Sequence, residues 1–296
     1  MTGVELKPQA ERQLPLGEET FLDHIGHFVA SPDAASKGLT EAGFFATPVS
    51  IQEDGGKLTG TGNVTAMMER GYIEVLFKTA DTPLAGELEA AMARYRGIHL
   101  AAFAVADAEA FHCGLADRGF RVRPLVHMQR PVDAEDEPGT AAFTLARLEP
   151  GEMPEGRVQA LTHHTEELVW QRRWLSHPNG ALALVRLVVA VADVDEAARR
   201  YARFTGRQAR ASRFGTNIEL DRGRLDLVSA EEFRQMLPAI AIPSLPFMGA
   251  CEIRVASLAA LRDLLKQAGM KTSERGQCLV AQFADEIGQG AWLFSE

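Results

Sequence analysis

The sequence predicts an α+β fold built from four consecutive βαβββ modules. Two observations support this. An apolar strand followed by a short helix rich in Ala and Leu, ending near a glycine, occurs four times along the chain. Each copy then continues with strand-like segments that close with a turn and a last strand. A repeat of this length indicates one supersecondary unit per copy, so the copies define the architecture.

The first half of each module is the clearest part of the pattern. The opening strands are predicted at residues 22–29, 98–105, 183–191 and 250–256. The helix after each strand begins near Ser or Asp, which caps free backbone N–H groups. It ends at Gly43, Gly119, Gly206 or Gly269, where glycine adopts the left-handed conformation at low cost. The spacing of Ala and Leu suits one helix face laid on a sheet.

The second half of each module is recognised by its last turn and strand. In the first and third modules the turns Glu69-Arg70-Gly71 and Asp221-Arg222-Gly223 precede YIEVLF and RLDLV, which is a hairpin signal. Weaker versions precede RVQALTH (157–163) and AWLF (291–294) in the second and fourth modules. We therefore expect an N-terminal extension (1–20), a first paired domain (21–165), a bridging segment (166–181) and a second paired domain (182–296).

Composition limits the class of protein without identifying its chemistry. The chain has 296 residues, 46% of them hydrophobic, and a net charge of −9, which argues against binding nucleic acid or anionic membranes. No apolar run approaches the roughly 20 residues that span a bilayer. Cys113, Cys251 and Cys278 form no CxxC pair, and the first 20 residues have no apolar signal core. These features favour a cytoplasmic protein.

Several segments resemble a known family. LDHIGHFV (22–29), GTGN (60–63), YIEVLF (72–77) and HHTEELVWQRRWLSHPNGA (163–181) are similar to landmarks of the glyoxalase-like domain family of the vicinal oxygen chelate superfamily. The resemblance implies that the modules pair into two half-barrel domains, each shaped like a cup. It also implies a divalent metal (Fe, Mn, Ni or Zn) held in one cup by residues of first and last strands, a small-molecule substrate and a homodimer.

Transferring the ligand positions to this sequence favours the first pair of modules. In the first module they fall on His24 and Glu74, and in the second module on Leu100 and Gln159. Leucine cannot bind a metal, and His99 is one residue away, so it faces the other side of the strand unless a bulge re-aims it. We expect His24 and Glu74 as ligands, with His99 or Gln159 completing the set.

Two expectations accompany this ligand set. Either Glu74 or His163, which follows Gln159 by four residues on the same strand face, is expected to transfer a proton. The simpler alternatives are that His24 is a strand histidine hydrogen-bonded to a neighbour and that Glu74 lies on a solvated face. In the bridging segment, Trp170 and Trp174 are one helical turn apart, which favours an anchored linker.

The same positions in the third and fourth modules are Arg186, Asp226, Ala250 and Leu293. Three of these residue types do not bind metals, so the second pair is predicted to be metal-free. This counts against an extradiol dioxygenase, whose iron site the resemblance would place in the second pair. The sequence therefore favours a metal-dependent lyase, isomerase or dioxygenase acting on a small oxygenated substrate. The alternative is a metal-free protein of the same fold that binds or sequesters a small molecule.

Overall fold

The computed structural model describes residues 8–9, 12–54, 56–134 and 138–296, so residues 1–7 and 10–11 of the predicted N-terminal extension lie outside the described residues. The first module consists of β1 (Thr20–Phe28), α1 (Pro32–Glu41), β2 (Ser50–Asp54), β3 (Lys57–Met67) and β4 (Tyr72–Lys78). Helix α2 (Pro83–Arg94) leads to the second module, with β5 (Gly97–Val105), α3 (Ala108–Asp117), β6 (Val126–Val132), β7 (Gly139–Arg147) and β8 (Arg157–His163).

The second half of the chain begins after the short helices α4 (Glu166–Val169) and η2 (Arg172–Trp174). The third module has β9 (Ala181–Val191), α5 (Val194–Thr205), β10 (Ala209–Ala211), β11 (Thr216–Glu219) and β12 (Arg224–Ser229). Helix α6 (Ala230–Met236) connects it to the fourth module, with β13 (Phe247–Val255), α7 (Leu258–Gln267), β14 (Thr272–Arg275), β15 (Cys278–Gln282) and β16 (Ala291–Ser295). None of the helices in the described ranges is long and apolar enough to cross a membrane.

The expected helix caps are present in all four modules. The first residue before each main helix uses its side chain to accept a hydrogen bond from a backbone N–H group, at Ser31, Asp107, Asp193 and Ser257. The glycine after each helix has a positive φ angle, as expected for Gly43, Gly119, Gly206 and Gly269. Local sequence signals therefore set the bounds of these helices.

All four modules share one strand register. The first strand runs parallel to the last strand in each module, and the facing residues are His24–Tyr72, Leu100–Arg157, Arg186–Arg224 and Ala250–Ala291. The last-strand positions chosen from the sequence (Glu74, Gln159, Asp226 and Leu293) each lie two residues beyond that pair. Counting along the sequence therefore selected structurally equivalent positions, and the predicted four-module fold class is confirmed.

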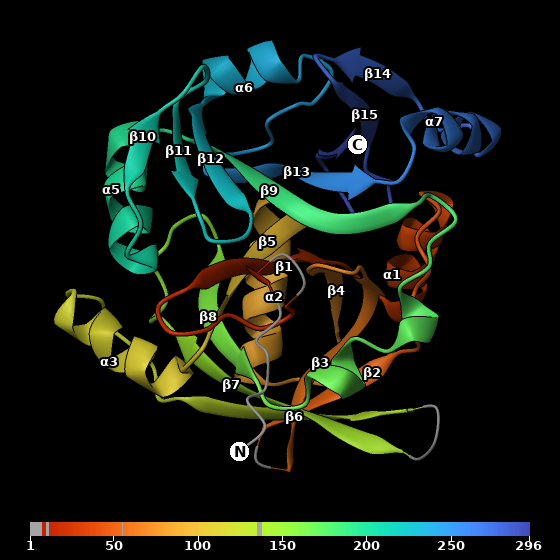
Figure 1. Cartoon of the computed structure of the whole chain (residues 1–296). Coiled ribbons are helices and arrows are strands. Elements are labelled where there is room, and N and C mark those ends of the chain that lie inside the picture. The colour runs from red at the N-terminus through yellow and green to blue at the C-terminus, as the bar shows by residue number, and fades with distance from the viewer. Residues whose placement is uncertain (1–7, 10–11, 55, 135–137) are drawn as a thin grey trace.

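The two pairs of modules differ in how their strands close. In the first pair β1 runs antiparallel to β5, and β2 also pairs with β6 through Glu53–Gln129 and Asp54–Met128. The strands of the first two modules thus return on themselves and surround an interior. In the second pair β9 pairs with β13, and β10 and β14 are not paired with each other in the described part of the chain. Figure 1 shows the two halves, with β9 and β13 running along the boundary between them.

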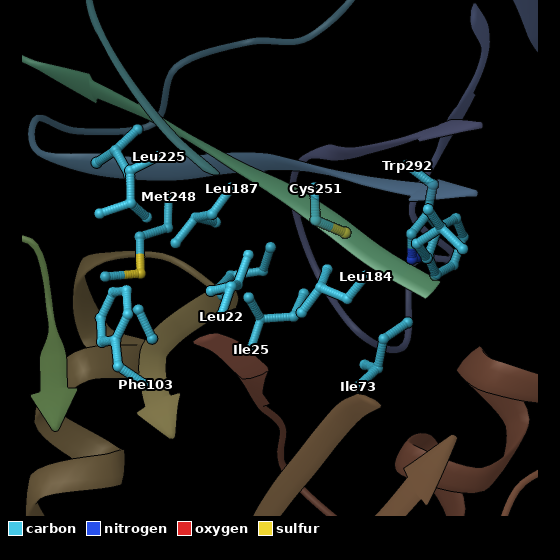
Figure 2. Packing of buried hydrophobic residues seen from close by; sticks show 14 of the residues in the cluster. Leu22, Ile25, Ile73, Phe103, Leu184, Leu187, Leu225, Met248, Cys251 and Trp292 are labelled. Carbon is cyan, nitrogen blue, oxygen red and sulfur yellow. The ribbon is translucent and has the colours of Figure 1, made fainter. Parts of the chain in front are cut away.

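One hydrophobic core is shared by both halves. Fully buried Leu22 and Ile25 of β1 belong to the same cluster as Leu184 and Leu187 of β9 and Met248 of β13 (Figure 2). Burial of this apolar surface is a main source of folding free energy. The division into domains at residues 21–165 and 182–296 stays a prediction, since residues of both halves belong to this core.

The two predicted acidic-Arg-Gly turns also join the halves. Arg70 in the first module exchanges backbone hydrogen bonds with β9: its N–H donates to Leu182 O at 3.1 Å, and its carbonyl accepts from Leu184 N at 2.9 Å. In the third module the carbonyl of Arg222 accepts from Leu22 N of β1 at 2.7 Å. Each turn therefore binds the first strand of the other half.

The turn glycine Gly223 is required on steric grounds. Its φ angle is +87°, and an added Cβ would lie 2.6 Å from Leu22 Cβ in the shared core. Gly119 has a similar φ of +81° but no atom within 4 Å of an added Cβ. We predict that Gly119→Ala lowers the free energy of unfolding by about 1 kcal/mol from backbone strain alone. Gly223→Ala should lower it by a further ~1–3 kcal/mol because the core must shift. Urea unfolding tests this, and equal losses in both variants would contradict it.

Candidate functional site

The first pair of modules surrounds a small buried cavity of about 40 Å³. His24 of β1, Glu74 of β4 and Gln159 of β8 all line it, so three of the four predicted ligand residues lie together. The remaining lining side chains are Gln52, Asn63, Thr65, Tyr72, Leu76, Leu100, Met128, Arg130, Phe143, Leu145, Arg147, Arg157 and Leu161. We call this space the inner cavity.

An irregularity in β1 shapes the wall beside His24. The pairing of β1 with β5 shifts between Leu22 and His24, so Asp23 has no opposing residue and forms a β-bulge. Asp23 is fully buried. A bulge breaks the strict alternation of side chains along a strand. The neighbouring residues Asp23 and His24 are thereby able to join one polar network.

Asp23 is the centre of that network. Its Oδ2 lies 2.7 Å from His24 Nδ1, and its Oδ1 lies 3.1 Å from Nε2 of His163. Burial alone would raise the pKa of Asp23, but the two histidines outweigh it and hold this pKa below the ordinary value. Burial opposes a charged His24 as well, yet its bonds with Asp23 and Glu74 raise the pKa of His24 to about 9.

Glu74 faces His24 across the inner cavity. Its Oε2 lies 3.5 Å from His24 Nε2, while its Oε1 accepts from Asn63 Nδ2 at 2.5 Å and from Gln52 Nε2 at 3.1 Å. Burial raises the pKa of Glu74, but the bond with His24 and the amide donor Asn63 lower it below the ordinary value. Glu74 is therefore held as a buried carboxylate, with one oxygen bound and the other turned toward His24.

Gln159 is the weakest of the three donors. It occupies the position in the second module that Glu74 occupies in the first, and its Oε1 accepts a hydrogen bond from Arg147 Nε at 3.1 Å. An amide oxygen binds cations less strongly than a carboxylate does, and this one is already engaged. Asn63 Oδ1, by contrast, is buried and has no hydrogen-bond partner among the described residues.

The structure separates His99 from this cluster, which corrects the expectation that it completes the ligand set. The bulge in β1 does not re-aim His99: Leu100 lines the inner cavity, and His99 lines a different space. Its Nε2 lies 2.7 Å from the backbone oxygen of Tyr95, and its ring stacks on Tyr95 at 4.0 Å. The pairing of β1 with β5 also shifts at His99, which has no opposing residue, and this irregularity does not turn its side chain into the inner cavity.

His163 also differs from its expected place. It is buried and bonded to Asp23, and its ring packs against Trp170 at 4.7 Å, but it does not line the inner cavity. His163 therefore cannot transfer a proton directly to a substrate in the inner cavity, because Asp23 lies between them. In this geometry His163 positions Asp23.

The bridging segment anchors to the first half, as its tryptophans suggested. Trp170 contacts Tyr72 edge-on at 6.0 Å, and Tyr72 in turn stacks on His24 at 4.3 Å. His177 accepts from the N–H of Phe45 at 2.9 Å through its Nδ1. These contacts fix one wall of the site.

The equivalent positions of the second pair hold an ion-pair cluster. Arg186 replaces His24, and its guanidinium lies 2.9 Å from Asp226, the equivalent of Glu74, and 2.6 Å from Glu252. The same strand register thus supports a different set of charges in each half.

Several residues of the site, some in the lining and Asp23 behind it, were not among the residues predicted from the sequence. Asp23 had a local signal in the pair Asp23-His24, and Asn63 had one in the segment GTGN. Three arginines had none that pointed to a site; they lie on β6, β7 and β8 and are Arg130, Arg147 and Arg157. Their convergence depends on the pairing of β6 with β7 and of β7 with β8.

Comparison with known proteins identifies the class of fold and then the family. The chain resembles a hypothetical protein from Staphylococcus aureus with a TM-score of 0.66 and 11% identity, covering 93% of this chain and 98% of that chain. A Mn(II)-bound glyoxalase from Novosphingobium aromaticivorans gives a TM-score of 0.52 at 11% identity, covering 93% and 82%. A variant of 4-hydroxymandelate synthase from Streptomyces coelicolor gives 0.51 at 12% identity, covering 93% and 92%.

These likenesses show a vicinal oxygen chelate fold. A family model described as a glyoxalase-like domain matches residues 22–205, and the chain belongs to that family. None of the curated proteins compared matches the sequence.

The buried histidines His27 and His99 make stability depend on pH. Burial is the main cause that lowers the pKa of each to about 4, whereas an unfolded histidine has a pKa near 6.5. Between pH 6.5 and 4 the unfolded chain therefore binds more protons, and stability falls as the pH falls. We predict that His99→Gln reduces this slope by about 1.4 kcal/mol per pH unit near pH 5. Urea unfolding from pH 7.5 to 4.5 measures it, and an unchanged slope would contradict the buried neutral state.

Proposed function

We propose that this protein is a divalent-metal-dependent enzyme that acts on a small oxygenated substrate in the inner cavity. The observation that carries the proposal is the pair His24 and Glu74, which come from two parallel strands and face each other across 3.5 Å. Both line the same small cavity, in a family whose fold is shared by a Mn(II)-bound glyoxalase. The reaction would be that of a lyase, isomerase or dioxygenase, since one fold supports each of these chemistries.

The side chains around His24 and Glu74 determine whether a metal ion fits. Within the described ranges, no group of three or more His, Cys, Asp and Glu side chains is arranged to hold a metal ion. His24 and Glu74 supply an imidazole and a carboxylate, a combination that suits Mn, Fe, Ni or Zn. Gln159 and the unpartnered oxygen of Asn63 add amide donors in the same lining. His24, Glu74 and Gln159 would thus hold the ion, which would act as a Lewis acid toward a substrate oxygen.

The protein's own groups have separable roles in this proposal. Asp23 engages Nδ1 of His24, which leaves Nε2 directed toward the cavity and fixes the ring orientation. His163 and Trp170 hold Asp23 and the wall of the site in place. Glu74 Oε2, which has His24 as its polar contact, is the group placed to accept or return a proton.

A metal-free binding protein is the second candidate, and two observations favour it. Leu100 stands where the second module would supply a ligand, and Arg147 already binds the oxygen of Gln159. Such a protein would take up its small molecule equally well with a chelator present.

The proposal also includes a cytosolic, reduced setting and a homodimer. All three cysteines are free in the structure. Strands β10 and β14 each pair with one strand only in the described part of the chain, and they offer edges for a second copy.

Metal analysis of matched variants tests the proposed function. We predict that protein purified without chelator contains a divalent metal and that Glu74→Gln lowers the metal content at least tenfold, because it replaces the carboxylate donor. Asp226→Asn is the control, since Asp226 holds the equivalent position in the second pair and should leave the content unchanged.

Two results would contradict the metal enzyme. One is a wild-type protein with no metal after incubation with Mn(II), Fe(II), Ni(II) and Zn(II) in turn. The other is equal metal content in wild type and Glu74→Gln. A small molecule that raises the melting temperature equally with and without EDTA would support the binding protein instead.

A further inference from the structure

The inner cavity is strongly basic, although the chain carries a net charge of −9. Three guanidinium groups line it, those of Arg130, Arg147 and Arg157, and Glu74 is the one carboxylate in the described lining. The arginines come from β6, β7 and β8, which lie side by side in the sheet. Positive charge is therefore concentrated on one wall of the inner cavity.

The three arginines differ in their partners. Arg157 donates to Glu87 Oε2 at 3.3 Å and so has a counterion. Arg147 donates through Nε to the neutral amide of Gln159 at 3.1 Å. Among the described residues Arg130 has no hydrogen bond or ion pair; the ring of Phe143 lies 6.0 Å from its guanidinium carbon.

Two unpaired cations are thus buried together. Arg130 and Arg147 are each only 9% exposed. Burial is the main cause that lowers the pKa of Arg147 to about 9 and that also lowers the pKa of Arg130, which reflects the cost of removing a guanidinium from water. A protein that gains nothing from these charges would be more stable with apolar side chains there. The charge of Glu74 acts on both arginines and that of Glu87 on Arg147, but neither acid forms an ion pair with Arg130 or Arg147 among the described residues. A bound anion would supply the ion-pair partner that both guanidinium groups lack.

We propose that Arg130 and Arg147 bind the carboxylate of the substrate, so that the substrate is a small carboxylic acid. That the acid is a substrate rests on the proposed function, whereas its binding by the two arginines does not. A guanidinium offers a planar fork of donors that matches a carboxylate. The acid group is placed by the two arginines, and the oxygenated part of the molecule then lies toward His24 and Glu74 in the same lining.

The size of the space agrees with a small acid. A cavity needs roughly 10–15 Å³ to hold one water, so the inner cavity of about 40 Å³ accepts only a few heavy atoms. A second cavity of about 370 Å³ shares Arg147 and Arg157 with it.

Calorimetric binding in EDTA tests the proposal without metal or turnover. The probes are lactate, pyruvate and malonate, each compared with its neutral amide, and inorganic phosphate. We expect at least one acid to bind at least tenfold more tightly than its amide. Arg130→Met and Arg147→Met should each weaken this binding at least tenfold, and Arg147→Lys should restore part of it. Arg213→Met, which changes an exposed arginine of the second pair, is the control and should bind like wild type.

The melting temperature without ligand provides the second readout. Because both methionine variants remove a buried cation that lacks a counterion, we expect each to melt at a higher temperature than wild type. Arginines that only stabilise the fold would give lower melting temperatures and unchanged acid binding, which would overturn the proposal. Equal binding of acids and amides, or binding of phosphate alone, would also overturn it. Absence of a metal would contradict the proposed function and leave this result intact.

Discussion

The site in the first pair of modules depends on the hydrogen bonds that the buried carboxylate of Asp23 makes with two histidines. A fully buried carboxylate must be paired, and here two histidines from different modules supply the partners. The pairing ties β1 to β8, orients the ring of His24 and thereby directs His24 toward Glu74. The bulge in β1 makes this arrangement available, because regular alternation would send neighbouring side chains to opposite faces. One extra residue in a strand thus determines the polar side of the site.

Equivalent positions in the two halves of the molecule hold different charged side chains. All four modules keep one strand register, and the halves share one core. The difference lies in side chains and in closure. In the first pair β2 meets β6 and surrounds a small basic space, while in the second pair Arg186 forms ion pairs with Asp226 and Glu252. In the second pair of modules, the charges of Arg186, Asp226 and Glu252 therefore neutralise one another.

Local and periodic features were the predictable part of this molecule. Caps, helix-ending glycines and the acidic-Arg-Gly turns depend on neighbouring residues, and the repeat gave the equivalent positions Leu100 and Gln159 correctly. The role of Asp23 was not predictable, because a bulge depends on how β5 pairs with β1. The convergence of Arg130 and Arg147 was hidden for a related reason: the pairing of β6 with β7 sets which residues lie side by side, and the sequence does not give that register. His99 was misplaced because its residue type suited a ligand while its strand face did not.

We propose that a divalent ion binds between His24 and Glu74 in the first pair of modules and that the second pair binds none. Anomalous diffraction from crystals soaked in Mn(II) tests both parts in one experiment. We expect a peak within bonding distance of His24 Nε2 and Glu74 Oε2, and none at the ion pair of Arg186 and Asp226. A peak at the second position, or no peak beside His24 in crystals that hold Mn(II) elsewhere, would contradict the account.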